Sequence, residues 1–219
     1  MKKDESYIPA FHFRWLTPWY DLIVGRLFAE IAVKGALITQ ARIQSGQSVL
    51  DVGCGTGTLA LLIKKTHPDA EVHGLDVDQQ ILDIALRKAQ QAGEVLALRQ
   101  GTATHLPYPD GSFDRVFASL MLHHLPREQK RQALGEIFRV LEPGGELHVA
   151  DFGKPNDWVM GLISLLIRWV EEMHDNILGL LPDFMAGAGF QPVAETARYR
   201  TVFGVIVLHK ACKPTGDVP

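Results

Sequence analysis

Nine residues, Val49 to Gly57, constrain the fold of this chain more than any other stretch. They read Val-Leu-Asp-Val-Gly-Cys-Gly-Thr-Gly, an apolar run with an aspartate, followed by glycine at every second position. This pattern is typical of a buried parallel strand that turns sharply into a helix. Glycines in such a turn adopt positive φ and let a ligand contact the backbone, and the N–H groups that open the next helix favour electron-rich ligand atoms. We therefore expect a ligand-binding turn at Gly53, Gly55 and Gly57.

The rest of the chain alternates strands with helices. The patterns predict strands over 48–52, 71–76, 95–99, 113–118 and 146–150, with helices over about 17–42, 58–67, 79–93 and 127–141. A turn at 142–145 precedes the last of these strands, and Leu86 is among the residues expected to face inward on the helix that Asp78 caps. After Lys154 the pattern predicts helices over about 156–173 and 176–188, then extended segments near 191–198 and 201–210. Alternation of this kind indicates an α/β fold with a doubly wound parallel sheet.

Composition narrows the class of protein. The chain has 219 residues, of which 47% are apolar and 21% charged, and its formal charge of −3 leaves no electrostatic footprint for nucleic acid. Its two cysteines, Cys54 and Cys212, form no metal-ligand cluster and predict a reducing cytoplasm, with Cys54 interpreted as a small buried residue. The N-terminus lacks the apolar core of a signal peptide, and the longest apolar run, 158–170, is too short to span a membrane and contains Arg168. We expect one cytoplasmic domain that binds neither nucleic acid nor a metal.

The ligand of the glycine turn is narrowed by the residues around it. Asp76 closes the second predicted strand about 20 residues after the glycines, where an acid on the neighbouring strand accepts both hydroxyls of a ribose. A dinucleotide site requires Gly-x-Gly-x-x-Gly, but counted from Gly53 that pattern places Thr58 at the third glycine. A P-loop requires a lysine after the last glycine, and none follows Gly57. A nucleoside without pyrophosphate remains.

Four stretches together resemble a known family. Val49 to Gly57, Gly74 to Asp76, Leu106 to Asp114 and Leu141 to Gly145 are similar, in order and spacing, to the signatures of class I S-adenosylmethionine-dependent methyltransferases. The similarity covers about 47–152 and is closest to the small-molecule branch that contains the ubiquinone and menaquinone biosynthesis methyltransferases. It implies a Rossmann-like, mostly parallel seven-stranded sheet with helices on both faces and an antiparallel last strand.

The resemblance also implies a domain organisation. A helical cap is expected over 1–45, the methyltransferase domain over 46–213 with a helical insertion at about 155–188, and a tail over 214–219. The N-terminal and C-terminal helical elements form the lid of the fold in this family. Tyr20 and Asp21 are candidates to cover the cofactor, although a core aromatic explains Tyr20 equally well.

The resemblance implies roles for residues that match the family's motifs. S-adenosyl-L-methionine, which becomes S-adenosyl-L-homocysteine, is expected against Asp51, Gly53, Cys54, Gly55, Thr56, Gly57, Asp76, Val77, Thr102, Ala103 and Ser119. In this reading Asp51 meets the methionine ammonium through the loop or a water, Asp76 holds the ribose and Val77 packs on adenine. The family usually has an acid at the position of Thr102, so adenine recognition is expected to keep fewer charge-assisted contacts here.

Three residues are candidates for the chemistry. His123 and His124 follow the fourth strand, where either can contact the cofactor's carboxylate or act as a base toward an acceptor hydroxyl, or simply pack locally. Their adjacency predicts side chains that point apart, which disfavours a two-histidine metal site. Asp151, at the end of the fifth strand, is the other candidate base. Methyl transfer from a sulfonium mainly requires alignment and exclusion of water, so a marked catalytic constellation is not essential.

The acceptor is the open question. The apolar segment after 155 either packs against the N-terminal helix or forms a hydrophobic entrance for a small amphiphilic acceptor, such as a quinone precursor or a lipid met at a membrane surface. The chain lacks the Asn/Asp-Pro-Pro-Tyr/Phe motif of DNA amino-methyltransferases and the several thiolates of arsenite methylation. The alternative from another class is a non-catalytic S-adenosylmethionine-binding or scaffold subunit, and the oligomeric state is not predicted.

Overall fold

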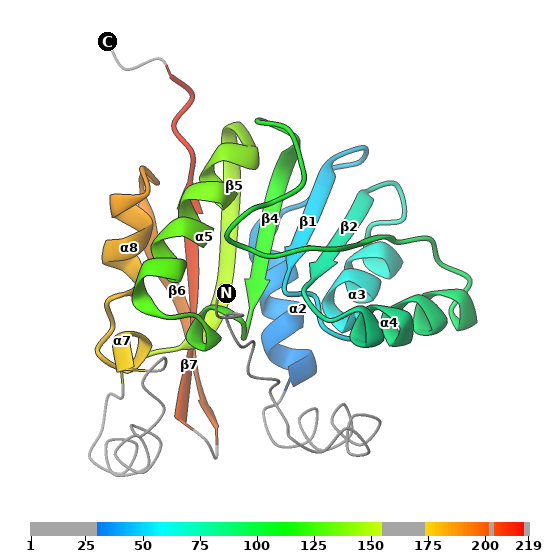
Figure 1. Ribbon diagram of the computed structural model, residues 1–219, viewed down its shortest axis with the longest axis horizontal. Coiled ribbons are helices and arrows are strands. Elements are labelled where there is room, and N and C mark those ends of the chain that lie inside the picture. The colour runs from blue at the N-terminus through cyan, green and yellow to red at the C-terminus, as the bar shows by residue number, and fades with distance from the viewer. Residues whose placement is uncertain (1–29, 155–173, 202–203, 217–219) are drawn as a thin grey trace, which may run out of the picture.

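The computed structural model describes residues 30–154, 174–201 and 204–216, and these residues form a seven-stranded sheet (Figure 1). The strand order is β3-β2-β1-β4-β5-β7-β6. β7 is antiparallel to both of its neighbours, whereas the pairs among β1 to β5 are parallel. The strands are β1 (Ser48–Val52), β2 (Glu71–Asp76), β3 (Ala97–Gln100), β4 (Phe113–Ser119), β5 (Leu141–Phe152), β6 (Val193–Thr201) and β7 (Gly204–Cys212). The Rossmann-like sheet with an antiparallel last strand is confirmed.

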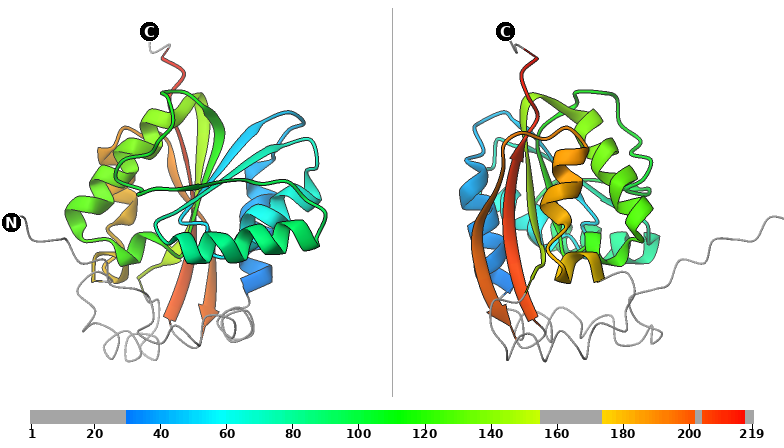
Figure 2. Two further views of the ribbon diagram at one scale, coloured as in Figure 1. Left: turned by 45° about the vertical axis from the view of Figure 1, so that its right-hand side comes forward. Right: turned by 90° about the vertical axis from the view of Figure 1, so that its left-hand side faces the viewer.

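Helices cover both faces of this sheet. The helices are α2 (Glu30–Ala41), α3 (Thr58–Thr66), α4 (Gln79–Gln91), the 3₁₀ turn η2 (Leu122–His124), α5 (Arg127–Val140), α7 (His174–Ile177) and α8 (Leu181–Gly187). An edge-on view places α2 on one face and α5 with α8 on the other (Figure 2). The buried core divides in the same way, with α2 and α3 in one apolar cluster and α5 with α8 in the second. No helix in the described ranges is long and apolar enough to cross a membrane.

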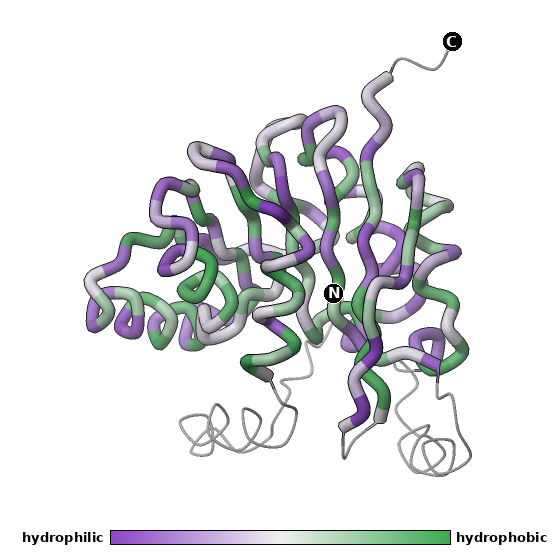
Figure 3. The backbone as a smooth tube through the Cα atoms, turned by 180° about the vertical axis from the view of Figure 1, so that it is seen from behind, coloured by the Kyte–Doolittle hydropathy of each residue, from purple (hydrophilic) through white to green (hydrophobic). Residues whose placement is uncertain are grey.

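Helix α4 shows how the local sequence directs packing. Asp78 is its N-cap, and the Asp78 carboxylate accepts the Gln80 N–H at 2.8 Å. Hydrophilic and hydrophobic residues alternate along the coil (Figure 3), and Leu82, Ala85 and Ala89 form the buried stripe. The prediction that Leu86 faces inward is wrong, because Leu86 is 46% exposed and lies about 100° around the helix from Ala85.

Three predicted boundaries differ from the structure for identifiable reasons. The third strand begins at Ala97, where its pairing with His73 starts, and not at residue 95 as predicted. The predicted turn at 142–145 is an irregularity within β5, since Leu141 pairs with Phe113 and Glu146 with Arg115. The predicted helix over 176–188 is divided into α7 and α8 by Gly179, whose φ is 77°. The helices predicted before residue 30 and over 156–173, with Tyr20 and Asp21, lie outside the described residues.

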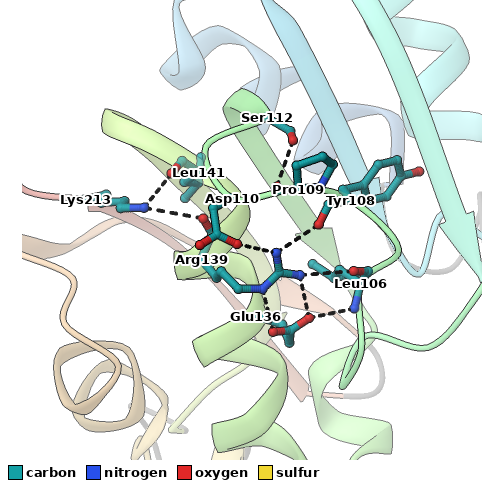
Figure 4. Close-up of polar contacts among 9 residues, drawn as sticks. All are labelled: Leu106, Tyr108, Pro109, Asp110, Ser112, Glu136, Arg139, Leu141 and Lys213. Carbon is teal, nitrogen blue, oxygen red and sulfur yellow. Dashed lines mark hydrogen bonds and ion pairs between the residues drawn. The ribbon is translucent and has the colours of Figure 1, made fainter.

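The stretch from Leu106 to Asp114 is fastened to α5 by one arginine (Figure 4). Arg139 donates to both oxygens of Glu136 at 2.8 Å, and also to the carbonyls of Tyr108 at 2.9 Å and Leu106 at 3.0 Å. A further bond to the Asp110 carboxylate, at 2.8 Å, completes the network. The side-chain hydrogen bond from Arg139 lowers the pKa of Glu136 despite partial burial. This loop, which replaces a helix between β3 and β4, therefore positions the start of β4.

Candidate functional site

The glycine turn has the backbone that its sequence predicts. Gly53, Gly55 and Gly57 have φ values of 68°, 54° and 73°. A Cβ at Gly53 would lie 2.8 Å from the Met121 Cβ, and one at Gly57 would lie 2.9 Å from the Ala85 Cβ. A Cβ at Gly55 would meet nothing within 4 Å. Packing therefore requires glycine at the outer two positions, while Gly55 leaves exposed backbone for a ligand to contact.

Asp76 is held directly beside this turn. Its Oδ2 accepts the N–H of Gly55 at 2.9 Å, and its Oδ1 accepts the N–H of Asp78 at 3.0 Å. The Gly101 N–H also binds the Asp76 carbonyl at 2.9 Å, which brings the loop after β3 to the same place. Each carboxylate oxygen retains capacity for a second donor. The arrangement fits a ribose whose two hydroxyls donate to Asp76.

Asp51 lies under the turn and is 2% exposed. Burial raises the pKa of Asp51 to about 7, and the negative charge of Asp76 adds to the effect. The cation of Lys34 in α2 and the Ala60 N–H act in the opposite direction but do not cancel it. A cationic ligand near Asp51 would favour the ionised carboxylate.

Cys54 and Thr56 fill the turn between the glycines. Cys54 is 8% exposed, and burial raises the pKa of its thiol, so a thiolate nucleophile is disfavoured. A Cβ on Gly74 would lie 3.0 Å from the Cys54 Sγ, which accounts for the glycine in β2. Thr56 accepts a bond from the Lys88 Nζ at 3.1 Å, and the same nitrogen binds the Thr58 hydroxyl at 2.9 Å. Sequence reasoning missed Lys88, since nothing in its local pattern distinguishes it from a surface lysine of α4.

The residues expected around adenine gather beside Asp76. Val77 is 42% exposed, and its carbonyl accepts a bond from Gln100 at 3.0 Å. The Thr102 hydroxyl lies 2.6 Å from that of Thr104 and accepts the Thr104 N–H at 3.1 Å, so it is engaged in its own turn. Ala103 is 9% exposed and packs into the core.

On the other side of the turn, Asp151 and His123 form a buried pair. The His123 Nδ1 lies 2.7 Å from the Asp151 Oδ1, and Asp151 also accepts the N–H groups of Leu122, His123 and Phe152 at 2.7 to 3.2 Å. Burial alone would raise the pKa of Asp151. Electrostatic attraction to His123 and the hydrogen bonds that Asp151 accepts from His123 and from the Phe152 N–H outweigh burial, so the pKa lies below its usual value. An ionised carboxylate only accepts, so Nδ1 carries a proton, and in the neutral imidazole the free lone pair would then lie on Nε2.

His124 lies beside this pair on η2. The His123 and His124 ring centroids are 4.0 Å apart, so the expectation that the two side chains point apart is wrong. The tight 3₁₀ geometry of η2 brings these neighbours together, which a regular helix would not do. His124 is exposed, whereas His123 is 7% exposed and its ring meets the Phe152 ring edge-on at 4.9 Å. Within the described ranges, no group of three or more His, Cys, Asp or Glu side chains is placed to hold a metal.

Ser119 ends β4 between these two parts. It pairs with Ala150 of β5 and is partly buried. The next residue, Leu120, has a φ of 54° and donates its N–H to the Ala150 carbonyl at 2.8 Å. This sharp departure from the sheet directs Met121 toward Gly53. The cofactor candidates and the His123–Asp151 pair are therefore adjacent at the carboxyl ends of the neighbouring strands β1, β4 and β5.

Comparisons with known proteins agree on the kind of domain. Residues 49–145 match the methyltransferase domain family. A demethylmenaquinone methyltransferase from Thermus thermophilus is 37% identical over 154 residues, which are 69% of this chain and 69% of that protein. One from Deinococcus radiodurans is 34% identical over 167 residues, which are 75% and 68% of the two chains. Phosphoethanolamine N-methyltransferase 2 from Haemonchus contortus, solved with S-adenosyl-L-methionine, has a TM-score of 0.74 at 16% identity and shares the fold over 94% of this chain and 58% of its own.

Proposed function

Because this chain belongs to the class I S-adenosylmethionine-dependent methyltransferases, in the branch of the demethylmenaquinone methyltransferases, we propose that it methylates the ring of a small, apolar quinol. The support is the identity of 34 to 37% with two enzymes named for demethylmenaquinone. A buried histidine–aspartate pair suited to removing a hydroxyl proton also favours this class of acceptor. S-adenosyl-L-methionine supplies the methyl group already activated by the positive charge of its sulfonium.

Residues of the glycine turn would hold that cofactor. Asp76 would accept from the ribose hydroxyls, and the N–H groups of Gly55 and Asp78, which it already accepts, support this by fixing its orientation. The backbone at Gly55 provides a surface with no side chain in the way, and Val77 offers an exposed apolar contact for adenine. Asp51 would become ionised as the methionine ammonium approaches, because the new charge opposes the effects that raise its pKa.

His123 is the base that this geometry favours among the three candidates. Asp151 is already saturated by four donors and its pKa is lowered, so its role is to orient the imidazole and balance the charge of the imidazolium. His123 Nε2 takes the proton of a ring hydroxyl, which makes a neighbouring ring carbon electron-rich. S-adenosyl-L-methionine, held by the glycine turn, would supply the methyl group to that carbon. The carbon's own proton would then pass to water, and His123 would return its proton to the ring oxygen, which restores the aromatic hydroxyl.

The test is a methyl-transfer assay with labelled cofactor. A reduced naphthoquinone with a short prenyl chain and an open ring position is the proposed acceptor, and the matched control has a methyl group at that position. We expect transfer to the first compound and none to the second. Binding of S-adenosyl-L-methionine by calorimetry without transfer to any quinol would instead indicate the non-catalytic subunit.

A contact with a membrane surface is a further part of this proposal. An apolar quinol with a long chain resides in the bilayer, so the enzyme would meet it there. Co-sedimentation with vesicles that contain the quinol tests this, and we expect binding that persists at high salt, because apolar contact rather than charge would hold a chain of net charge −3 to the bilayer. Absence of binding, together with full activity on a water-soluble acceptor, would contradict it.

A further inference from the structure

Helix α4 contacts the glycine turn at two places. A Cβ at Gly57 would lie 2.9 Å from the Ala85 Cβ, so α4 packs directly against the last glycine of the turn. About one helical turn further along α4, the Lys88 Nζ donates to the hydroxyls of Thr56 at 3.1 Å and Thr58 at 2.9 Å. α4 is therefore fastened to the residues on both sides of Gly57.

The backbone between the two threonines lets one ammonium bind both hydroxyls. Gly57 has a φ of 73°, and the Oγ1 atoms of Thr56 and Thr58 lie 3.4 Å apart. This left-handed conformation turns the chain sharply where α3 begins, and the hydroxyls stay close together only while the turn keeps it. An ammonium that binds both hydroxyls therefore stabilises this conformation of the turn over others.

A lysine can stabilise the turn without occupying its N–H groups. Gly57 is the N-cap residue of α3 and has no side chain with which to cap the helix. The usual caps accept N–H groups of the first turn, which an electron-rich ligand atom would also need. An ammonium only donates, so Lys88 does not compete with a ligand for these groups. Because a cation near a helix N-terminus is unfavourable, attraction to the dipole of α3 does not account for its position.

The N-terminal end of α4 is tied to the proposed ribose acceptor. Asp76 accepts the N–H of Asp78, the N-cap of α4, at 3.0 Å and the N–H of Gly55 at 2.9 Å. Lys88 makes its contacts to the turn ten residues further along the same helix. α4 thus connects Asp76 with both halves of the glycine turn.

We propose that Lys88 is a positioning residue for S-adenosyl-L-methionine, and that it holds the glycine turn in the shape that receives the methionine part of the cofactor. It acts through Thr56 and Thr58 and does not itself contact the cofactor. The inference rests on the proposed placement of the cofactor at this turn, and it is independent of the identity of the methyl acceptor.

Lys88→Met tests this, because methionine keeps an unbranched apolar stem and removes the ammonium. We expect the Kd values for S-adenosyl-L-methionine and S-adenosyl-L-homocysteine to rise by about tenfold, since a turn that is no longer preorganised binds less tightly. Adenosine lacks the methionine part, so its Kd should not change. Calorimetry on the full chain measures all three values, and the Tm of each sample shows that the protein is folded.

The sign of the effect separates positioning from charge alone. S-adenosyl-L-methionine carries a net positive charge, so loss of a nearby cation would by itself strengthen its binding. Arg87→Met removes the same charge from an exposed position of α4 and should not weaken binding.

A matched pair of variants at Thr58 tests the partner hydroxyl. Thr58→Val removes the hydroxyl and keeps the shape, so it should weaken binding in the same way as Lys88→Met. Thr58→Ser keeps the hydroxyl and should bind as the wild type does. The double variant Lys88→Met/Thr58→Val should bind no more weakly than Lys88→Met alone, because both changes remove one interaction.

Two results would overturn the inference. The first is a Kd for S-adenosyl-L-methionine that is unchanged or lower in both Lys88→Met and Thr58→Val. The second is an equal weakening of S-adenosyl-L-homocysteine and adenosine, which would indicate a general loss of structure. A wild-type protein that binds S-adenosyl-L-methionine but methylates no quinol rejects only the proposed acceptor, and a tenfold rise in Kd for Lys88→Met would still support the role of Lys88.

Discussion

Asp51 near the end of β1 and Asp151 near the end of β5 are buried to a similar degree, at 2% and 0% exposure, yet their pKa values move in opposite directions. Burial raises the pKa of Asp51 to about 7, and the nearby charge of Asp76 reinforces it. At Asp151 burial also raises the pKa, but His123 and the Phe152 N–H lower the pKa by more than burial raises it. The two carboxylates differ in the number of hydrogen-bond donors that the protein provides to each of them.

The two carboxylates therefore represent two kinds of site. Asp151 is satisfied within the fold, so the part around β4, β5 and η2 is organised without a ligand. Asp51 is not balanced by the fold, so the part around β1 and β2 gains most from a cation that binds there. Preorganisation on the proposed acceptor side and a demand for positive charge on the proposed cofactor side would suit methyl transfer from a cationic donor.

The largest effect on catalysis is expected when the proposed acceptor side loses its proposed base, His123. His123→Gln should lower kcat by about 10² to 10⁴-fold, the usual contribution of general base catalysis, with the Kd for S-adenosyl-L-methionine unchanged. Single-turnover methyl transfer measures the first quantity and calorimetry the second. The control is His124→Gln, at the exposed neighbour. An equal loss in both variants would mean that His123 is not the base.

Asp151→Ala should destabilise the folded protein. Removal of this carboxylate leaves His123 and three backbone N–H groups buried without an acceptor, so the free energy of unfolding at pH 7 should fall by about 3–5 kcal/mol. Because the pKa of Asp151 is lowered in the folded state, its stabilisation is present above pH 4 and is lost as the pH falls further. Urea denaturation at pH 7 and pH 3 measures this, with exposed Asp183→Ala as the control. A difference that does not shrink in acid would contradict the assigned ionised state.

The cofactor side is tested by Asp76→Ala. We expect binding of S-adenosyl-L-methionine to weaken by about 1–3 kcal/mol, because two ribose hydroxyls lose a charged partner and Gly55 loses its anchor. Asp78→Ala is the control, since it removes the α4 cap and should lower stability with little change in affinity. Unchanged affinity in Asp76→Ala would show that the ribose is held elsewhere.

Ionisation of Asp51 makes both the cofactor affinity and the stability depend on pH, and its effect on stability has the opposite sign to that of Asp151. Its ionised form is favoured by the ligand, so the affinity for S-adenosyl-L-methionine should rise by roughly fivefold from pH 6 to about pH 7.5 and fall above pH 8, where the cofactor's own ammonium loses its proton. In the ligand-free protein the raised pKa means that stability is lost as the pH rises through about 7. Asp51→Asn should therefore be more stable than the wild type at pH 8 while it binds the cofactor weakly and without this pH dependence. A flat wild-type profile over pH 6 to 8 would contradict the role of Asp51.

The same contrast explains what the sequence could predict. The proposed cofactor side is built from residues close together in the sequence. The backbone of Gly53 to Gly57 has few allowed conformations, and the spacing to Asp76 is typical of a ribose site, so both could be predicted from the sequence. The acceptor side depends on partners far apart in the chain, such as Asp151 with His123, and no local pattern indicates such pairs. The direction of the two histidine side chains was predicted wrongly for this reason, since it depends on the 3₁₀ turn that Asp151 stabilises through the Leu122 N–H.

The smallest expected effect concerns Thr102, where this chain departs from the acid usual in its family. The Thr102 hydroxyl is engaged by Thr104, so an adenine amine finds no charged acceptor from this side chain. Thr102→Asp would keep an oxygen for the Thr104 N–H and add a carboxylate beside Val77. We expect S-adenosyl-L-methionine to bind more tightly by about 0.5–1.5 kcal/mol, or roughly 2 to 10-fold, as for a hydrogen bond that gains a charge. Thr104→Asp is the matched control, and an equal gain there would mean that the added negative charge, rather than a contact with adenine, attracts the cationic cofactor.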